Sequence, residues 1–149
     1  MRSITLAQYV EKRNGVPLGA PDSLKNMLIR SLSAPNFSTF WHYWNPIWGY
    51  YLSKLVMRPL ARFLPKPIAL LLTFITSGLF HDLAIFLVKR ERVGFLSLWF
   101  GYMGIAVIVT TFLNMSTKTL PLWVRGVVNI AIIAGCFICA KVTDVSHFI

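Results

Sequence analysis

Charged side chains are scarce in this sequence. Asp, Glu, Lys and Arg together make up 13% of its 149 residues, whereas a soluble domain carries about 25% charged residues. Hydrophobic residues make up 56%, and the mean hydropathy is +0.61. This composition excludes a disordered tail and argues against a soluble globular domain. It predicts an integral membrane protein with a single domain.

Acidic residues are especially rare. The chain has 5 Asp and Glu against 15 Lys and Arg, which gives a net charge of +10. Such an excess is typical of nucleic-acid-binding proteins and also of basic residues that face anionic lipid headgroups. The basic residues here flank long apolar runs and do not form one basic face. We therefore favour membrane lipids as partners and expect no nucleic acid.

Cysteine is also rare, and the two that are present exclude a disulfide scaffold. Cys136 and Cys139 have the spacing of a CxxC pair inside an apolar run. A redox or metal pair is one interpretation, but a metal would require additional ligands. We favour small apolar residues of a buried helix and expect no metal site.

Three apolar runs are long enough to cross a bilayer, because a hydrocarbon core of about 30 Å needs about 20 helical residues. They cover residues 67–88, 93–114 and 120–140. We therefore predict an all-α membrane protein, in which region 67–149 holds three transmembrane helices. The short connections between the runs predict that neighbouring helices are antiparallel.

The distribution of basic residues weakly favours a cytoplasmic N-terminus. One side of the membrane would carry more of them than the other. The richer side has Lys54, Arg58, Arg62, Lys66, Lys118 and Arg125, and the poorer side has Lys89, Arg90, Arg92 and Lys141.

Region 1–66 mixes charged and apolar residues, which predicts amphipathic helices at the membrane interface. A first helix is expected over residues 5–13, and a second begins after Asp22 as its N-cap. Asn45 and Pro46 read as an N-cap followed by proline at the first helical position. The helix that starts there should run to residue 64 with a kink at Pro59. Lys54, Arg58 and Arg62 recur every four residues along it as a basic stripe.

His81 is the most informative residue, because it lies inside the first predicted span. Ionisable groups at such depth are costly and usually face a protein interior or a watery cavity. Ser77 falls on the same helical face one turn earlier, so a structural polar patch is the alternative to a functional site. Asp82 points about 100° away from His81 and should face a neighbouring helix or a basic residue such as Lys89.

Asn45 is the second polar residue of interest, because it lies among tryptophans. It acts either as the helix cap described above or as an active-site amide. Trp41, Trp44 and Trp48 form either an aromatic belt at the interface or part of that site.

Two segments together resemble motifs of the membrane-bound O-acyltransferase superfamily. Phe40-Trp41-His42-Tyr43-Trp44-Asn45-Pro46 is similar to an aromatic F-W/Y-x-x-W-N motif. Ser77-Gly78-Leu79-Phe80-His81-Asp82, with His81 36 residues after Asn45, is similar to an S-G-x-x-H motif followed by an acidic residue. The chain looks most like the C-terminal portion of the wax synthase and sterol or diacylglycerol acyltransferase branches.

This resemblance implies transfer of an acyl group from a thioester to a hydroxyl acceptor. His81 would be the catalytic base and Asn45 its helper, with Asp82, Ser77, Trp41 and Trp44 in support. No tightly bound cofactor is implied, and the donor would be acyl-CoA or an acyl-carrier thioester. The basic stripe of Lys54, Arg58 and Arg62 would hold donor phosphates or acidic carrier residues, or simply contact lipid headgroups.

Typical members of this superfamily have more membrane spans than the three predicted here. We therefore expect the chain to act as a homo-oligomer or with another membrane subunit, or to continue upstream of Met1. The alternative function is a non-catalytic membrane subunit or lipid-binding scaffold of a larger complex.

Overall fold

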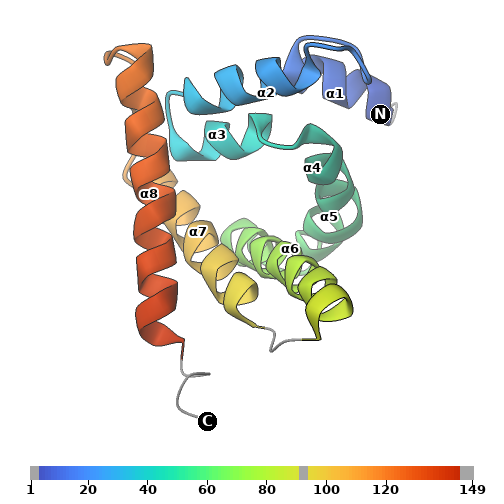
Figure 1. Cartoon of the computed structure of the whole chain (residues 1–149), viewed down its shortest axis with the longest axis vertical. Coiled ribbons are helices and arrows are strands. Elements are labelled where there is room, and N and C mark those ends of the chain that lie inside the picture. Colours follow the sequence, from blue (N-terminus) through green and yellow to red (C-terminus); the bar gives the residue numbers. More distant parts are fainter. Residues whose placement is uncertain (1–3, 91–93, 145–149) are drawn as a thin grey trace.

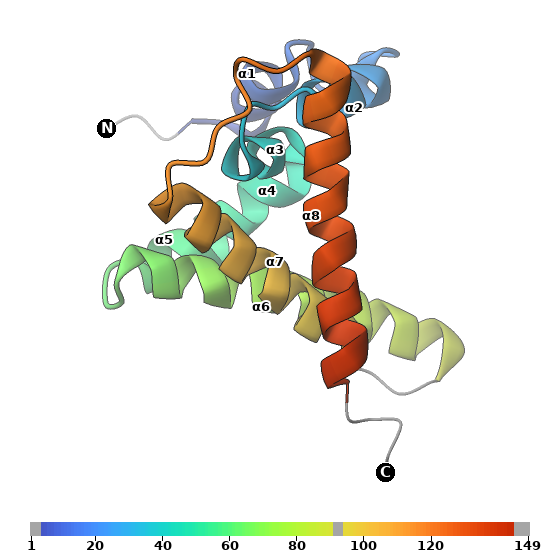
Figure 2. The ribbon, with the colours of Figure 1, turned by 90° about the vertical axis from the view of Figure 1, so that its left-hand side faces the viewer.

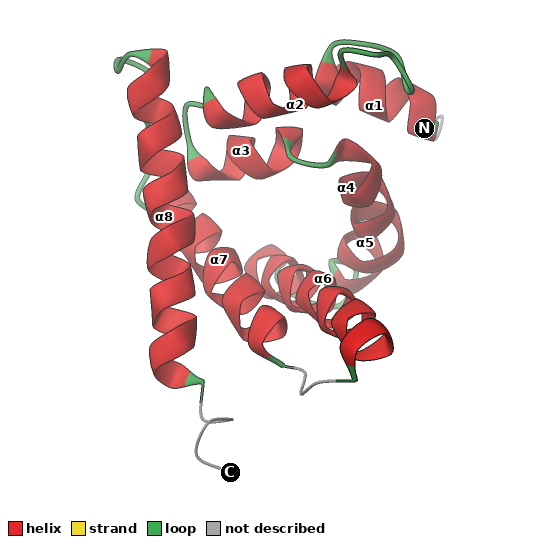
Figure 3. Cartoon of the chain, viewed as in Figure 1, coloured by secondary structure: helices red, strands yellow, loops and turns green. Residues whose placement is uncertain are grey.

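The computed structural model describes residues 4–90 and 94–144, and its regular structure there is entirely helical (Figure 3). The predicted all-α class is confirmed. Seen as in Figure 1, α2 (Ser23–Leu32) and α3 (Phe37–Tyr43) lie across the top. The chain continues through α4 (Pro46–Leu52) to α6 and α7 at the bottom, and α8 stands at the left.

Three long apolar helices match the predicted spans. They are α6 (Lys66–Lys89), α7 (Phe95–Phe112) and α8 (Leu122–Thr143), and each is long and apolar enough to cross a membrane. Proline precedes two of them at Pro65 and Pro121, where a missing N–H costs nothing. The chain is therefore a multi-pass integral membrane protein. The ends of the three helices lie within a few residues of the predicted ends.

The third span departs from the antiparallel arrangement that the short loops predict. α6 and α7 run side by side in opposite directions, but α8 crosses the pair steeply (Figure 2). Its first half is held by the loop between α2 and α3. Asn129, which is buried, donates to the carbonyl of Ala34 at 3.1 Å, and Arg125 donates to the carbonyl of Ser33 at 3.5 Å.

Helix α1 (Leu6–Asn14) lies close to its predicted range and α2 begins after Asp22 as predicted, whereas the sequence did not predict α3 as a helix. Helix α1 starts with a capping box between Thr5 and Gln8 and ends at Gly15, which has a φ of 81°. Asp22 precedes α2, but its side chain makes no capping hydrogen bond, so that prediction is wrong. Its backbone, at φ −85° and ψ 6°, lacks the extended geometry that aims a cap at the helix.

The helix that begins at Pro46 also differs from the prediction. After α4 it widens into the π-helical segment η1 (Ser53–Met57) and ends with α5 (Arg58–Leu60), short of residue 64. Pro59 has no N–H to donate to the carbonyl four residues earlier. The chain adapts before this proline, where the N–H of Arg58 donates to the carbonyl of Ser53, five residues back.

Helices α6 and α7 meet at backbone distance near their connecting loop. A Cβ atom placed on Gly78 would lie 2.5 Å from the Cα of Ser97, so only glycine fits there. One turn later the buried Asp82 carboxylate accepts hydrogen bonds from the N–H groups of Leu96 and Ser97, at 3.1 and 2.9 Å. It also accepts one from the Ser97 hydroxyl at 2.5 Å. Because Gly94 offers no side chain at the start of α7, Asp82 of α6 caps that helix.

The best-buried apolar cluster lies between α3 and the spans. Phe37 and Phe40 of α3 pack with Ala34 and Val107 of α7. This cluster attaches the interfacial helices to the membrane helices and fixes the aromatic segment that follows Phe37.

Replacing Asp82 with alanine tests the cap between α6 and α7. The change leaves two backbone N–H groups at the start of α7 without their acceptor, in a place that is buried in the protein. We expect the free energy of unfolding to fall by about 1–3 kcal/mol, measured by thermal unfolding in detergent. Asp22→Ala is the matched control and should unfold like the wild type, because Asp22 makes no capping bond. Equal unfolding temperatures for the two variants would contradict the capping role.

Candidate active site

His81 lies on α6, and the backbone fixes which of its ring nitrogens carries the proton. Its Nδ1 is 2.6 Å from the carbonyl oxygen of Ser77, one turn earlier. A carbonyl oxygen only accepts hydrogen bonds, so Nδ1 must be the donor in the neutral ring. Nε2 then carries the lone pair, and the ring is exposed at the surface of the chain. This geometry leaves a basic nitrogen directed away from its own helix.

Two aromatic rings from other helices contact the His81 imidazole. Phe100 of α7 stacks on it with ring centroids 4.9 Å apart and planes 29° apart. Trp48 of α4 meets it edge-on at 6.2 Å and 90°. The sequence does not indicate Phe100, which is one of 11 phenylalanines. Trp48 stood out only as a member of the aromatic segment.

Ser77 connects α4 to the histidine. Its side chain is only 3% exposed, and its hydroxyl accepts a hydrogen bond from the Trp48 indole N–H at 2.9 Å. Its carbonyl accepts from His81. Ser77 and His81 thus lie on the same face of α6, as predicted. Ser77 makes one hydrogen bond to Trp48 and another to His81.

Asn45 adopts the capping geometry expected of it. Its Oδ1 accepts a hydrogen bond from the Trp48 backbone N–H at 3.2 Å, and its φ of 40° lies in the left-handed region that asparagine tolerates. Within residues 4–90 and 94–144, Asn45 makes no hydrogen bond to His81, and its side-chain NH₂ has no hydrogen-bond acceptor. The link between the two polar residues runs through Trp48, three residues after Asn45.

Trp41 and Trp44 occupy different places. Trp41 lies edge-on to Phe74 of α6 at 5.1 Å and tilted against Phe100 at 6.2 Å. Its Nε1 is buried and has no hydrogen-bond partner in the described part of the chain. Trp44 stacks on Phe40 at 5.5 Å and is partly exposed. Trp41 is therefore connected to His81 through Phe100, whereas Trp44 lies two rings further away, behind Phe40 and Trp41.

Asp82 points away from His81, toward the start of α7, as described above. Of the two predicted surroundings, a neighbouring helix or a basic residue such as Lys89, the structure shows the neighbouring helix, because the partners are Leu96 and Ser97 of α7. The carboxylate acts on α7 and makes no contact with the imidazole.

The basic stripe of Lys54, Arg58 and Arg62 is exposed along η1, α5 and the turn that follows. The Lys54 ammonium lies 5.5 Å from the centre of the Tyr50 ring. Met57 of η1 accepts a weak hydrogen bond from Thr73 at 3.7 Å, which attaches this segment to α6.

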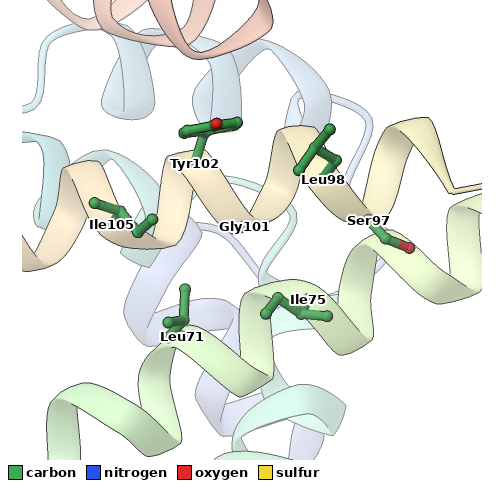
Figure 4. A pocket seen from close by; sticks show the side chains of 7 residues that line it. All are labelled: Leu71, Ile75, Ser97, Leu98, Gly101, Tyr102 and Ile105. Atoms are coloured by element: carbon green, nitrogen blue, oxygen red, sulfur yellow. The ribbon is translucent and has the colours of Figure 1, made fainter. Parts of the chain in front are cut away.

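A shallow apolar groove of about 440 Å³ lies between α6 and α7. Figure 4 shows its lining residues, which are Leu71, Ile75, Ser97, Leu98, Gly101, Tyr102 and Ile105. His81, Asn45 and Trp48 do not line this groove.

No curated protein and no solved structure matches this chain. Residues 12–141 match the family model of the membrane-bound O-acyltransferase family, MBOAT. This match covers most of the chain, including all three spans and both polar segments around Asn45 and His81. The chain therefore belongs to the membrane-bound O-acyltransferase family.

Proposed function

We propose that the chain transfers an acyl group from a thioester donor to a hydroxyl acceptor, with His81 as the general base. Family membership indicates membrane-bound O-acyltransferase activity in general terms. The observation that carries the specific proposal is the 2.6 Å contact between His81 Nδ1 and the Ser77 carbonyl. It places the proton on Nδ1 and leaves the Nε2 lone pair for a substrate hydroxyl.

The chemistry follows from that tautomer. Nε2 takes the proton of the acceptor hydroxyl as its oxygen attacks the thioester carbonyl carbon. The carbon–sulfur bond then breaks, an ester forms, and the departing thiolate receives the proton from the imidazolium. General-base help of this kind contributes about 10²- to 10⁴-fold in rate. The membrane excludes competing water, so the bound alcohol is the favoured nucleophile.

Asn45 is proposed to stabilise the negative charge that develops on the thioester carbonyl oxygen. Its Oδ1 is engaged as the cap of α4, so its side-chain NH₂ remains as the donor. A preorganised donor at a developing oxyanion is worth about 3–4 kcal/mol where it has been measured. Trp41 and Trp44 would shape the apolar walls on this side of the site.

The donor is proposed to be acyl-CoA or an acyl-carrier thioester, with no tightly bound cofactor. The exposed stripe of Lys54, Arg58 and Arg62 offers cations for donor phosphates or for acidic carrier residues, and it suits lipid headgroups equally well. A homo-oligomer or another membrane subunit is proposed to complete the site, because the His81 ring is exposed on the described chain. The N-terminus is proposed to face the cytoplasm.

A second candidate function is a non-catalytic membrane subunit or lipid-binding scaffold. The observation that favours it is the position of the apolar groove between α6 and α7, whose lining does not include His81. In that case the polar residues of α6 would serve assembly alone.

Replacing His81 with alanine decides between these two functions. The enzyme interpretation predicts that acyl transfer by expression-matched membranes falls at least about 10²-fold, because the base is gone. His42→Ala is the matched control, since His42 occupies a variable position of the aromatic motif, and it should retain wild-type turnover. Equal turnover from His81→Ala and wild-type membranes would refute the catalytic assignment.

Two substitutions of Asn45 separate its cap from its proposed donor role. Asn45→Asp keeps the capping oxygen and tolerates the left-handed backbone but removes the NH₂ group, so turnover should fall while thermal stability stays close to wild type. Asn45→Ala should lose turnover and also about 1 kcal/mol of stability, because the cap is removed. Turnover and unfolding of both variants are measured on the same preparations. An Asn45→Asp protein with full turnover would leave Asn45 as a cap only.

A further inference from the structure

The surroundings of His81 contain more than its hydrogen bond to Ser77. A histidine on an exposed helical face would ordinarily exchange among rotamers. Here Phe100 covers one face of the ring and the Trp48 edge bounds another side. These contacts come from two different helices, so they hold the ring only when α4 and α7 are both in place against α6.

Trp48 is itself fixed by three contacts. Its indole N–H donates to the Ser77 hydroxyl at 2.9 Å. Its ring meets Phe80 edge-on at 5.6 Å. Its backbone N–H is held by the Asn45 cap at the start of α4. The indole therefore joins α4 to α6 at the residue whose carbonyl binds His81.

Phe100 is fixed from the other side. It contacts the Trp41 ring at 6.2 Å, and its helix is locked onto α6 by Gly78 and by the Asp82 cap. Any movement of the start of α7 would carry Phe100 away from the imidazole. The ring stack thus depends on the close contact between α6 and α7.

We propose that Trp48 and Phe100 are positioning residues that hold the His81 imidazole with Nε2 directed at the acceptor hydroxyl. This inference rests on the proposed function. The hydrogen bond to Ser77 sets the tautomer, and the two rings set the tilt of the imidazole. Misplacing a catalytic group by about 1 Å can cost about 10²-fold in rate, so the rings matter even though neither touches the substrate proton.

The first test measures His81 itself, independently of turnover. The full chain in lipid nanodiscs is treated with diethyl pyrocarbonate, which acylates an unprotonated imidazole nitrogen, and modification is followed for each histidine by mass spectrometry. His42 is the internal reference. Loss of solvation and, secondly, the charge of Arg13 lower the pKa of His42, which keeps that ring neutral and reactive at pH 7.

Three variants loosen the proposed contacts. Trp48→Phe and Ser77→Ala each remove the same hydrogen bond, and Phe100→Leu removes the stack. We expect the modification rate of His81 to rise several-fold in each, with the rate at His42 unchanged. The double variant of Trp48 and Ser77 should be no more reactive than Trp48→Phe alone, because that single variant has already lost the hydrogen bond.

Matched controls lose equivalent contacts elsewhere. Tyr102→Phe removes a hydrogen bond from the Tyr102 hydroxyl of α7 to the Thr143 hydroxyl of α8, 3.2 Å long in the structure. Phe95→Leu removes an aromatic pair with Phe137. Both should leave the reactivity of His81 at the wild-type level. Phe100→Leu is the variant most prone to misfold, and in that event Trp48→Phe and Ser77→Ala decide the outcome.

The second test measures acyl transfer by the same proteins. Trp48→Phe and Phe100→Leu should lower kcat by about 10- to 100-fold while KM stays within about 2-fold, because positioning acts on the reacting geometry and not on substrate binding. Variants of Trp48 and Phe100 that behave like Tyr102→Phe and Phe95→Leu in both measurements would overturn the inference. If the variants change the reactivity of His81 but the wild-type protein transfers no acyl group, the ring contacts are upheld and the proposed function is refuted. Active wild-type protein with unchanged His81 reactivity in the variants would overturn the positioning role alone.

Discussion

The close contact between α6 and α7 is the constraint on which the rest of the site depends. Gly78 lets the two backbones approach, and Asp82 supplies the acceptor that the first N–H groups of α7 lack. The first N–H groups of any helix have no acceptor within that helix. The Asp82 carboxylate therefore takes the capping role that the N-cap residue Gly94, which has no side chain, cannot fill. Because both residues come from α6, the position of α7 is set by the helix that carries His81.

The site is built outward from this contact by aromatic rings. Phe100 follows α7 and reaches the imidazole, and Trp41 packs behind Phe100. Trp48 approaches from α4 and bonds to Ser77. The family motif around Trp41 and Asn45 and the polar segment around His81 are thus joined by ring contacts, although 36 residues separate Asn45 from His81 in the sequence.

The parts of this structure that could be predicted are those that depend on local sequence. The spans follow from the length of apolar runs, and the pairing of Ser77 with His81 follows from the helical repeat. The cap at Asn45 follows from the proline after it. Asp22 has the same kind of side chain at a similar place, yet its backbone, at φ −85° and ψ 6°, lacks the geometry for capping.

The parts that escaped prediction depend on contacts far apart in the sequence. Phe100 meets His81 only because α7 folds back on α6, and no pattern distinguishes it from other phenylalanines. The steep crossing of α8 depends on Asn129 and Arg125 binding carbonyls of the loop between α2 and α3. The π-helical segment η1 precedes Pro59, which has no N–H to donate, and η1 also packs on α6.

The need for hydrogen bonds inside the bilayer separates the polar groups of this site into those with protein partners and those without. Lipid tails offer no partners, so a polar group at this depth is either satisfied by protein or remains open for a ligand. The hydroxyls of Thr73 and Ser77, the Trp48 indole and the Asp82 carboxylate all have protein partners. Within the described residues, the exposed His81 Nε2 makes no hydrogen bond, and the buried Nε1 of Trp41 has no partner. A buried unmet group such as Trp41 Nε1 costs free energy in the unliganded protein, and a carbonyl oxygen bound to it would recover part of that cost. The pattern of satisfied and open groups thus favours a site that binds polar substrate atoms on the side of α6 that faces Trp48 and Phe100.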